Sequence, residues 1–494
     1  MDSKHTQNML RDLLGDSKVR VDGETLSSRS HDFWLLDFQR RLHGQPQEQP
    51  LCVVMAQSAD DVVAVVRFAV ENGIALVPYG AGSGVCGGAR PGTEAIVLDV
   101  SRMNRLVSIN EMALTVTVQP GMMGNQLEAA LNQAGYSMGH FPQSINLSSV
   151  GGWVATRASG QFSTKYGGIE DMLVSLKGVL ADGTLLETRN SPRTATGPSV
   201  NELMLGSEGT LAVLTELTFK IHPLPEKRAV RAFQFDSFAA GLNAIRLIMR
   251  EGWKPALARL YDAAETKRHF AKEAARGTCV LLVLSEGPAA LADAELAQCT
   301  RIAMAQGAVD IGEGPVRHWL EKRFNIPNLN ELATEKGVVF DTIEVAANWD
   351  CIHAVYQDAV KRLKQIPGIV AASAHSSHSY QQGTCLYFTF AIKKPYWLWR
   401  QIARRVRLAS FTQAEDLAAV EASYNAGWTA VMEATLANGG TISHHHGVGK
   451  VRMPWLRTEL SLSYPVLAAV KAALDPKGVL NPGTLFPRKG GDNE

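Results

Sequence analysis

The sequence has almost no net charge, because 49 lysine and arginine residues face 48 aspartate and glutamate residues, a balance of +1. Without an overall positive field, the chain has no long-range attraction for nucleic acid or an anionic membrane. No stretch approaches the ~18 uninterrupted apolar residues of a membrane span. The first residues also lack the basic and apolar regions of a secretory signal. We therefore expect a cytoplasmic protein with no transmembrane segment and no nucleic-acid partner.

Cysteine is scarce, and no two cysteines form a C-x-x-C pair. This spacing argues against a zinc knuckle, an iron–sulfur cluster and a disulfide framework. The six residues are Cys52, Cys86, Cys279, Cys299, Cys351 and Cys385.

The length of 494 residues exceeds what one hydrophobic core holds, about 250–300 residues, so more than one domain is expected. A Pro-rich segment, HPLPEK, interrupts the chain near residue 225, and glycine-rich sequence returns near residue 440. We predict an α+β fold with a first domain over 1–225 and a second over 226–436. The segment 437–494 is predicted to return to the first domain and complete it.

A glycine-rich loop follows a predicted strand early in the chain. Its glycines permit positive φ and present backbone N–H groups to a phosphate, and Ser83 adds a hydroxyl donor. The spacing matches neither a P-loop nor the G-x-G-x-x-G turn of a Rossmann site. Taken alone, the loop is equally compatible with a tight turn. It comprises Pro78, Tyr79, Gly80, Ala81, Gly82, Ser83 and Gly84.

Two later segments are also rich in small and hydroxylated residues. Three such segments in one chain predict a backbone cradle around a large phosphorylated cofactor. The candidates in the first segment are Gln143, Ser144, Ile145, Asn146, Leu147, Ser148, Ser149, Thr156, Arg157, Ala158 and Ser159. Those in the second are Glu208, Gly209, Thr210, Leu211, Ala212, Val213 and Leu214.

The order of the motifs P-x-G-x-G-S, P-Q-S, A-T-x-A-S-G, Y-G-x-I-E-D, G-S-E-G-T-L and GVLNPGTLF resembles the vanillyl-alcohol-oxidase-type (PCMH-type) FAD superfamily. GGWVATRASG and GGTISHHHGVGK are similar to alkyldihydroxyacetonephosphate synthase and related bacterial FAD-linked oxidoreductases. The resemblance covers residues 50–487. It implies a two-domain PCMH-type FAD-binding fold with an α+β substrate cap domain, in which the three segments hold FAD.

The resemblance also bears on how FAD is attached. Many relatives bind it covalently through a histidine or cysteine near the first loop. This chain has no histidine there, and its only thiol is Cys86, just past the loop. We therefore expect non-covalent FAD.

Three consecutive histidines, His444, His445 and His446, precede a Gly-Val-Gly turn. Three neighbouring side chains cannot all point one way, so their spacing argues against a metal site. The resemblance places this triplet at the active site, with His445 as the main candidate for proton transfer.

Three further residues are candidates for the catalytic face. Tyr387, on an alternating strand, matches an active-site tyrosine of the synthases, although strand tyrosines commonly serve packing. His378 is close to it in sequence. Arg259 matches a synthase arginine that would hold a phosphate or carboxylate; its alternative role is a salt bridge to Asp262.

Asn330 stands where the synthases have an arginine that handles the substrate's anionic group. An asparagine carries no charge, so we expect a substrate less charged than an acyl-dihydroxyacetone phosphate. Arg323 or Lys322 would replace the missing cation if the local alignment shifts.

The leading functional hypothesis is an FAD-dependent dehydrogenase of a small hydroxylated substrate, such as a 2-hydroxy acid, sugar acid or polyol. Hydride would pass to flavin N5, and electrons would leave to an electron-transfer flavoprotein, a quinone or oxygen. The alternatives are a synthase-like non-redox transferase and a non-catalytic electron-relay flavoprotein. A homodimer is also expected.

Overall fold

The computed structural model describes residues 3–394 and 413–488. The N-terminal half contains a four-stranded sheet of order β1-β2-β4-β3, in which β2, β4 and β3 are parallel. Helix α4 connects β2 to β3; Ser58 Oγ accepts the N–H of Asp61 at its start, and Gly73, with φ 65°, ends it. The elements are α1 (Ser3–Leu14), β1 (Val19–Arg20), α2 (Gly23–Ser28), α3 (Leu35–Leu42), β2 (Cys52–Met55), α4 (Ala59–Asn72), β3 (Leu76–Tyr79) and β4 (Ile96–Asp99).

A five-stranded antiparallel sheet of order β5-β6-β10-β8-β9 follows and packs beside the first. Its strands are β5 (Leu106–Asn110), β6 (Thr115–Val118), β8 (Leu173–Leu180), β9 (Leu185–Glu187) and β10 (Ala212–Lys220). The helices around it are α5 (Gly124–Gln133), α6 (Val150–Thr156), α7 (Ser163–Tyr166), α8 (Ile169–Met172) and α9 (Val200–Met204), and β7 (Tyr136–Ser137) pairs with β11 (His222–Pro223).

A seven-stranded antiparallel sheet of order β15-β12-β14-β13-β17-β18-β16 forms the second half. Its strands are β12 (Lys227–Phe235), β13 (Leu257–Tyr261), β14 (Cys279–Gly287), β15 (Val309–Gly312), β16 (Val338–Asn348), β17 (Ile369–Ser379) and β18 (Gly383–Lys393). The helices are α10 (Phe238–Arg250), α11 (Ala263–His269), α12 (Ala289–Ala305), α13 (Gly314–Lys322), α14 (Leu329–Thr334), α15 (Ile352–Gln365) and α17 (Gln413–Ala437).

The two faces of this sheet have different neighbours. Leu281 and Val283 share a hydrophobic core with α10, α12, α15 and α17, whereas Leu282 and Leu284 join the core of the five-stranded sheet. This follows from the strand period of two, which sends successive side chains to opposite faces. The sheet therefore has one helix-covered face and one face turned toward the N-terminal half. The predicted domain boundaries at 225 and 436 stay a prediction.

The C-terminal segment returns to the first sheet. It contains α18 (Met453–Leu460) and α19 (Tyr464–Leu474) and then pairs with β3: the N–H of Leu76 donates to Val479 O at 2.9 Å, and the N–H of Asn481 donates to Leu76 O at 2.8 Å. Asn481 Nδ2 also donates to Gly88 O and Glu208 O, at 2.9 and 2.7 Å. The segment thereby ties three early parts of the chain together.

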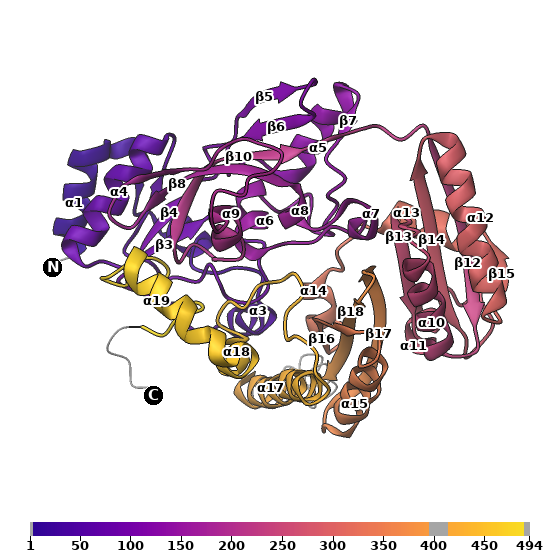
Figure 1. Cartoon of the computed structure of the whole chain (residues 1–494). Coiled ribbons are helices and arrows are strands. Elements are labelled where there is room, and N and C mark those ends of the chain that lie inside the picture. The colour runs from indigo at the N-terminus through magenta and orange to yellow at the C-terminus, as the bar shows by residue number, and fades with distance from the viewer. Residues whose placement is uncertain (1–2, 395–412, 489–494) are drawn as a thin grey trace.

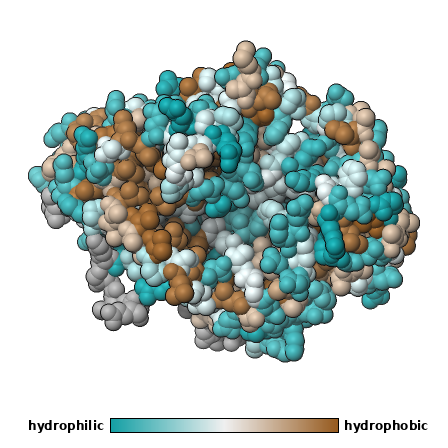
Figure 2. All heavy atoms as spheres, viewed as in Figure 1, coloured by the Kyte–Doolittle hydropathy of each residue, from teal (hydrophilic) through white to brown (hydrophobic). Residues whose placement is uncertain are grey.

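Helix α19 has its polar residue inside. Lys471 Nζ donates to Thr210 O and Leu480 O, at 2.7 and 2.9 Å, while Val466, 63% exposed, points outward. Apolar side chains gather on the surface over α18 and α19 (Figure 2). The predicted homodimer stays a prediction. Across residues 3–394 and 413–488, no helix has the length and apolar character that crossing a membrane requires.

Candidate active site

Four residues form a row across the second half's sheet. Glu344 on β16 pairs with Tyr387 on β18, Tyr387 pairs with His375 on β17, and His375 pairs with Tyr261 on β13. At least one strand neighbour of each lies in the core on the helix-covered face, so strand alternation directs this row toward the N-terminal half. The rings of His375 and Tyr387 are stacked, 5.0 Å apart at 15°.

The buried carboxylate of Glu344 holds the triple-histidine loop. It accepts the backbone N–H groups of His444, His445 and His446, at 3.2, 3.2 and 2.7 Å. The fully buried Arg452 donates to the same carboxylate at 2.9 Å. Burial alone would raise the pKa of Glu344, but the charge of Arg452 holds it below its ordinary value. A charged carboxylate therefore fixes three consecutive peptide groups.

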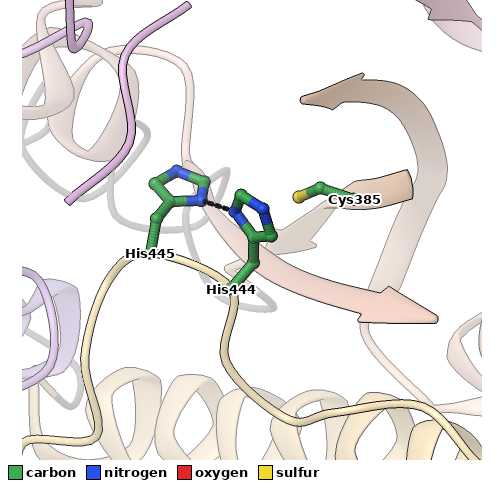
Figure 3. Close-up of side chains that lie close together, drawn as sticks. All are labelled: Cys385, His444 and His445. Carbon is green, nitrogen blue, oxygen red and sulfur yellow. Dashed lines mark hydrogen bonds between the residues drawn. The ribbon is translucent and has the colours of Figure 1, made fainter. Parts of the chain in front are cut away.

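The three imidazoles point in different directions, as their spacing predicted. His444 Nδ1 contacts His445 Nδ1 at 2.8 Å (Figure 3). His444 Nε2 contacts the Tyr380 hydroxyl at 2.7 Å. His446 Nε2 lies 3.3 Å from the Tyr387 hydroxyl. The histidine that contacts the Tyr387 hydroxyl is thus His446 and not His445.

Cys385 lies near two of these histidines (Figure 3). One donor atom of each of Cys385, His444 and His445 lies within 4.8 Å of the others. Burial raises the pKa of Cys385 well above its ordinary value, so without a metal the thiol stays protonated. The two histidines also turn a nitrogen toward each other, which leaves a poor ligand arrangement.

His378 joins this cluster to the predicted cofactor cradle. Its Nδ1 lies 2.6 Å from Ser163 Oγ and 3.3 Å from Ser159 Oγ. Its ring is 5.1 Å from that of His444 and 4.9 Å from that of His445. The backbone of His378 has φ 58°, a left-handed conformation that a β-strand rarely contains. It falls at the irregularity between Ser377 and Ser379, where the regular pairing of β17 with β18 is interrupted. Sequence-distant candidates thus meet at one place.

Burial keeps these histidines neutral. It lowers the pKa of His375, His444 and His446 to about 4, and the pKa values of His378 and His445 fall well below the ordinary range for the same first reason. Burial raises the pKa of Tyr387, so its hydroxyl stays protonated. At neutral pH the cluster offers uncharged nitrogen bases next to a phenol.

Arg259 does not form the salt bridge with Asp262 that was its alternative role. Asp262 instead caps α11, accepting the N–H groups of Ala264 and Glu265 at 3.0 and 2.9 Å. Arg259 Nε donates to the Tyr261 hydroxyl at 2.8 Å, and its Nη2 lies 2.6 Å from His375 Nε2. The guanidinium is therefore held by uncharged partners.

The three predicted cradle segments contact one another. A Cβ added to Gly80 would collide with Ser149 Oγ, and one added to Gly209 would press on the Pro78 ring at 2.9 Å. The N–H of Glu208 donates to Ala155 O at 2.8 Å. Ser149 Oγ is buried without a hydrogen-bond partner, so a phosphate oxygen at this place would accept the hydrogen bond that its hydroxyl can donate. The residues present fit the predicted FAD site.

Several candidates direct their side chains elsewhere. Ile145, Leu211, Ala212 and Val213 lie in the hydrophobic cores, so only their backbones remain for a cofactor. Tyr79 donates to His31 O at 3.1 Å. The Glu208 carboxylate accepts the N–H groups of Val448 and Gly449, at 2.7 and 3.0 Å. Glu208 thus secures the end of the histidine loop.

Asn330 does not lie where the substrate-charge argument needs it. It is exposed on α14, and its carbonyl accepts the Thr334 hydroxyl at 2.8 Å. Arg323, at the end of α13, instead packs beside Phe141 and Phe162 of the cradle region. The exposed side chain at position 330 therefore gives no support to the expectation of a weakly charged substrate, which stays a prediction.

Sequence reasoning missed four residues of the site: Glu344, His375, Tyr380 and Arg452. Glu344 and His375 are polar residues within strands, which is ordinary, and Tyr380 and Arg452 lie outside the strands, so their sequence positions gave little signal. Only the alternation along β17 could have identified one of them. It directs His375 to the sheet face opposite that of the buried Ala374.

Cradle, catalytic cluster and fold define a flavoprotein oxidoreductase. The family model for the FAD binding domain matches residues 50–189, and that for the C-terminal domain of FAD linked oxidases matches residues 224–485. The chain belongs to this family of FAD-linked oxidases, and its cofactor is FAD.

The relatives span the whole chain. The uncharacterized FAD-linked oxidoreductase YgcU of Escherichia coli O157:H7 is 34% identical, over 97% of this chain and 98% of its own. A solved structure of alkyldihydroxyacetonephosphate synthase has TM-score 0.78 at 26% identity, covering 98% of this chain and 85% of that one. A substrate-bound structure of p-cresol methylhydroxylase has TM-score 0.72 at 16% identity, covering 99% and 98%, and shows the same fold. The predicted PCMH-type fold is confirmed.

All FAD should leave the denatured protein on acid precipitation. The nearest thiol to the first loop, Cys86, is 2% exposed, and Arg452 Nη1 lies 3.0 Å from its sulfur. Burial raises the pKa of this thiol, so the nucleophilic thiolate is disfavoured. The measurement is flavin absorbance in supernatant and pellet. Flavin retained in the pellet, and lost from it in Cys86→Ala, would identify a covalent thioether instead.

Proposed function

We propose that this protein oxidises a small hydroxylated substrate, such as a 2-hydroxy acid, a sugar acid or a polyol, with FAD as the primary electron acceptor. The observation that carries the proposal is the contact between the Tyr387 hydroxyl and the neutral imidazole of His446, at 3.3 Å. A protonated phenol beside a nitrogen base is suited to remove the proton of an alcohol while its carbon loses hydride.

FAD, when bound, supplies the hydride acceptor. The residues that would hold it are the contacting segments around Gly80, Ser149 and Gly209. Ser159, which contacts His378 Nδ1 at 3.3 Å, links this cradle to the histidine cluster. The substrate would therefore lie between the cradle and the sheet row that contains Tyr387.

The proton would move along two residues. The substrate hydroxyl gives its proton to the Tyr387 oxygen while Tyr387 gives its own to His446 Nε2. The Glu344 carboxylate, 3.6 Å from His446 Nδ1, would stabilise the resulting imidazolium. In this arrangement His446 is the base, and the buried carboxylate of Glu344 orients it and compensates its charge. The role proposed for His445 becomes packing against His444 and His378.

An anaerobic screen of the holoenzyme tests this function. Hydroxy acids, sugar acids and polyols are mixed with it, and loss of flavin absorbance is followed together with formation of the carbonyl product. Reduction by one of these classes, with one product per flavin, supports the proposal. If none of them reduces the flavin while labelled fatty alcohol replaces the acyl group of an acyl-dihydroxyacetone phosphate, with release of the fatty acid, the non-redox reaction replaces the proposed oxidation.

The structural likeness to alkyldihydroxyacetonephosphate synthase makes that non-redox exchange the second candidate. The electron acceptor, an electron-transfer flavoprotein or a quinone, the cytoplasmic location and the homodimer belong to the same proposal. A non-catalytic electron relay is disfavoured by the Tyr387–His446 contact.

The rate of flavin reduction should stay constant as the pH falls from 8 to 5.5. Burial lowers the pKa of His446 to about 4, and the base must be neutral, so activity is present above that value and lost as the pH falls through it. An ordinary histidine would lose activity near pH ~6.5. Stopped-flow measurement of the limiting reduction rate over pH 4–8 gives the profile. An acid limb near 6.5 would show that His446 is not the base.

A further inference from the structure

His375 lies between a carboxylate and a guanidinium. Its Nδ1 is 2.8 Å from Glu265 Oε2, and its Nε2 is 2.6 Å from Arg259 Nη2. The side chains of His375 and Glu265 are only 8% and 2% exposed. Both ring nitrogens are therefore occupied by protein groups of opposite charge, and those groups decide which protons the ring carries.

The two partners of His375 permit one protonation state. A guanidinium only donates, so Nε2 must accept an N–H of Arg259. An ionised carboxylate only accepts, so Nδ1 must carry the proton and donate it to Glu265. An imidazolium would turn a second N–H, on Nε2, against the N–H of Arg259. The arrangement therefore selects the neutral imidazole with its proton on Nδ1.

The carboxylate of Glu265 is itself fixed and charged. Glu265 stands in the first turn of α11, where its N–H donates to Asp262 Oδ1 at 2.9 Å, and its Oε1 accepts the Thr389 hydroxyl at 3.0 Å. Burial alone would raise the pKa of Glu265, but His375 and the charge of Arg268 hold it below its ordinary value. Glu265 is thus an acceptor only, as the neutral state of the ring requires.

The other titratable groups around the His375 ring are uncharged at neutral pH. They come from β13, α11, β17 and β18: Tyr261, His269, His378 and Tyr387. Burial raises the pKa of the two tyrosines and lowers the pKa of the two histidines. Arg259 is therefore the cation that opposes a second proton on His375, and Glu265 is the anion that would favour it.

The charge of His375 matters because its ring stacks on Tyr387, 5.0 Å away at 15°. In the proposed reaction Tyr387 passes its proton to His446 Nε2, 3.3 Å from the hydroxyl oxygen, and a positive charge forms there. A second cation stacked on the same phenol would oppose that transfer, because like charges repel. A neutral ring at position 375 is thus a condition for the proton path.

We infer that Glu265 and Arg259 are positioning residues: together they hold His375 as a neutral imidazole protonated on Nδ1, and so keep positive charge away from the phenol of Tyr387. The effect on the reaction rests on the proposed function, whereas the state of the ring does not. This role of Arg259 concerns the N–H that it directs at His375 and is separate from any contact with a substrate.

NMR of the oxidised holoenzyme, with histidine labelled with nitrogen-15, reads the state of the ring directly, because the two tautomers and the imidazolium differ in their nitrogen shifts. The signals of His375 are those lost in His375→Gln. In wild type they should report the tautomer protonated on Nδ1 from pH 8 to 5.5. Arg259→Gln removes the cation and keeps Glu265, so the ring should take up a second proton at a pH about 1–3 units higher than in wild type.

Three further variants separate the charges. Arg259→Lys keeps a cationic donor and should keep the ring neutral. Arg268→Gln, the matched control, removes an arginine that acts on Glu265 but donates to Ser373 Oγ, at 3.0 Å, and should titrate like wild type. Glu265→Gln combined with Arg259→Gln also removes the anion that favours the second proton, so the midpoint should fall again.

The limiting rate of flavin reduction supplies the link to Tyr387. It is measured with the hydroxy acid, sugar acid or polyol that reduces the wild-type flavin in the anaerobic screen. In Arg259→Gln the rate should fall as the pH drops through the titration midpoint of His375. Wild type, Arg259→Lys and Arg268→Gln should show no such acid limb between pH 8 and 5.5.

A wild-type ring protonated on Nε2, or on both nitrogens at neutral pH, would overturn the inference. So would an Arg259→Gln variant whose His375 titrates as in wild type at equal FAD content. If no substrate class reduces the flavin while His375 titrates as expected, the proposed oxidation fails and the role of Glu265 and Arg259 stands. Flavin reduction in Arg259→Gln without an acid limb where His375 titrates would overturn the effect on Tyr387.

Discussion

Tyr387→Phe should lower the rate of flavin reduction by about 10²–10⁴-fold, the loss typical of removing a general acid or base. The substitution removes only the hydroxyl of Tyr387, whose oxygen lies 3.3 Å from His446 Nε2 and 3.4 Å from Thr342 Oγ1. His446→Ala should produce a loss in the same range, because the hydroxyl then has no base. Neither residue lies in the three cradle segments, so FAD content should hardly change.

The double variant distinguishes a shared proton path from two separate effects. Residues that act as one unit lose little more when both are removed, whereas independent losses multiply. Tyr464→Phe on α19 and His353→Ala on α15, which belong neither to the sheet row nor to the cradle segments, are the controls for the chemical change itself. Wild-type reduction rates in Tyr387→Phe would make the residue structural. A large loss in His445→Ala with none in His446→Ala would return the base to His445.

Glu344→Ala should destabilise the protein by about 3–5 kcal/mol, the effect of removing one partner of a buried ion pair. The substitution leaves the fully buried guanidinium of Arg452 without its carboxylate, and the N–H groups of His444 to His446 without their acceptor. The free energy of unfolding is measured by urea denaturation of the holoenzyme. Glu344→Gln keeps one acceptor oxygen for the loop and should therefore retain part of the stability.

The matched control is an exposed ion pair. Glu313 and Arg317 lie one helical turn apart, with side chains 44% and 69% exposed, and Glu313→Ala should cost at most about 1 kcal/mol. A Glu344→Ala variant as stable as Glu313→Ala would show that the loop needs no internal carboxylate. If it is destabilised but reduces its flavin at the wild-type rate, Glu344 supports the fold and not the proton path.

The three predicted cradle segments carried the clearest signal in the sequence, and that these residues hold FAD stays a prediction. Glycines and small hydroxylated residues are selected by backbone geometry, so the loop at Gly80 and the segments at Ser149 and Gly209 carried a local signal. The structure places these segments in contact. The strand–helix–strand unit around α4 was equally local, since its Ser58 cap and Gly73 stop are both read directly from sequence.

The catalytic face was harder, because it is built from pairings between distant strands. Glu344 meets Tyr387 only through the register of β16 against β18, and it meets the histidine loop only through the fold. Arg323 follows the end of a helix, so its sequence context is that of an ordinary exposed arginine. Only the tertiary structure brings four aromatic rings around it. Asn330 was expected at the substrate but lies exposed on α14. The reason is related, because an alignment position does not specify which side of a short helix faces a site. These relations depend on tertiary packing, which local pattern does not encode.

The edge of the first sheet is closed by the last described part of the chain. Asn481 bonds to Gly88, 393 positions earlier, and Leu480 forms a strand bridge with Leu76. During synthesis, which runs from the N-terminus, β3 emerges with its edge groups unpaired and stays so until the segment around Asn481 has been made. Until then the nascent chain exposes a bare strand edge, the kind of surface that promotes aggregation. Contacts of such long sequence separation also form slowly. The sheet that carries the glycine-rich loop after β3 is consequently completed only after the segment around Asn481 has been made.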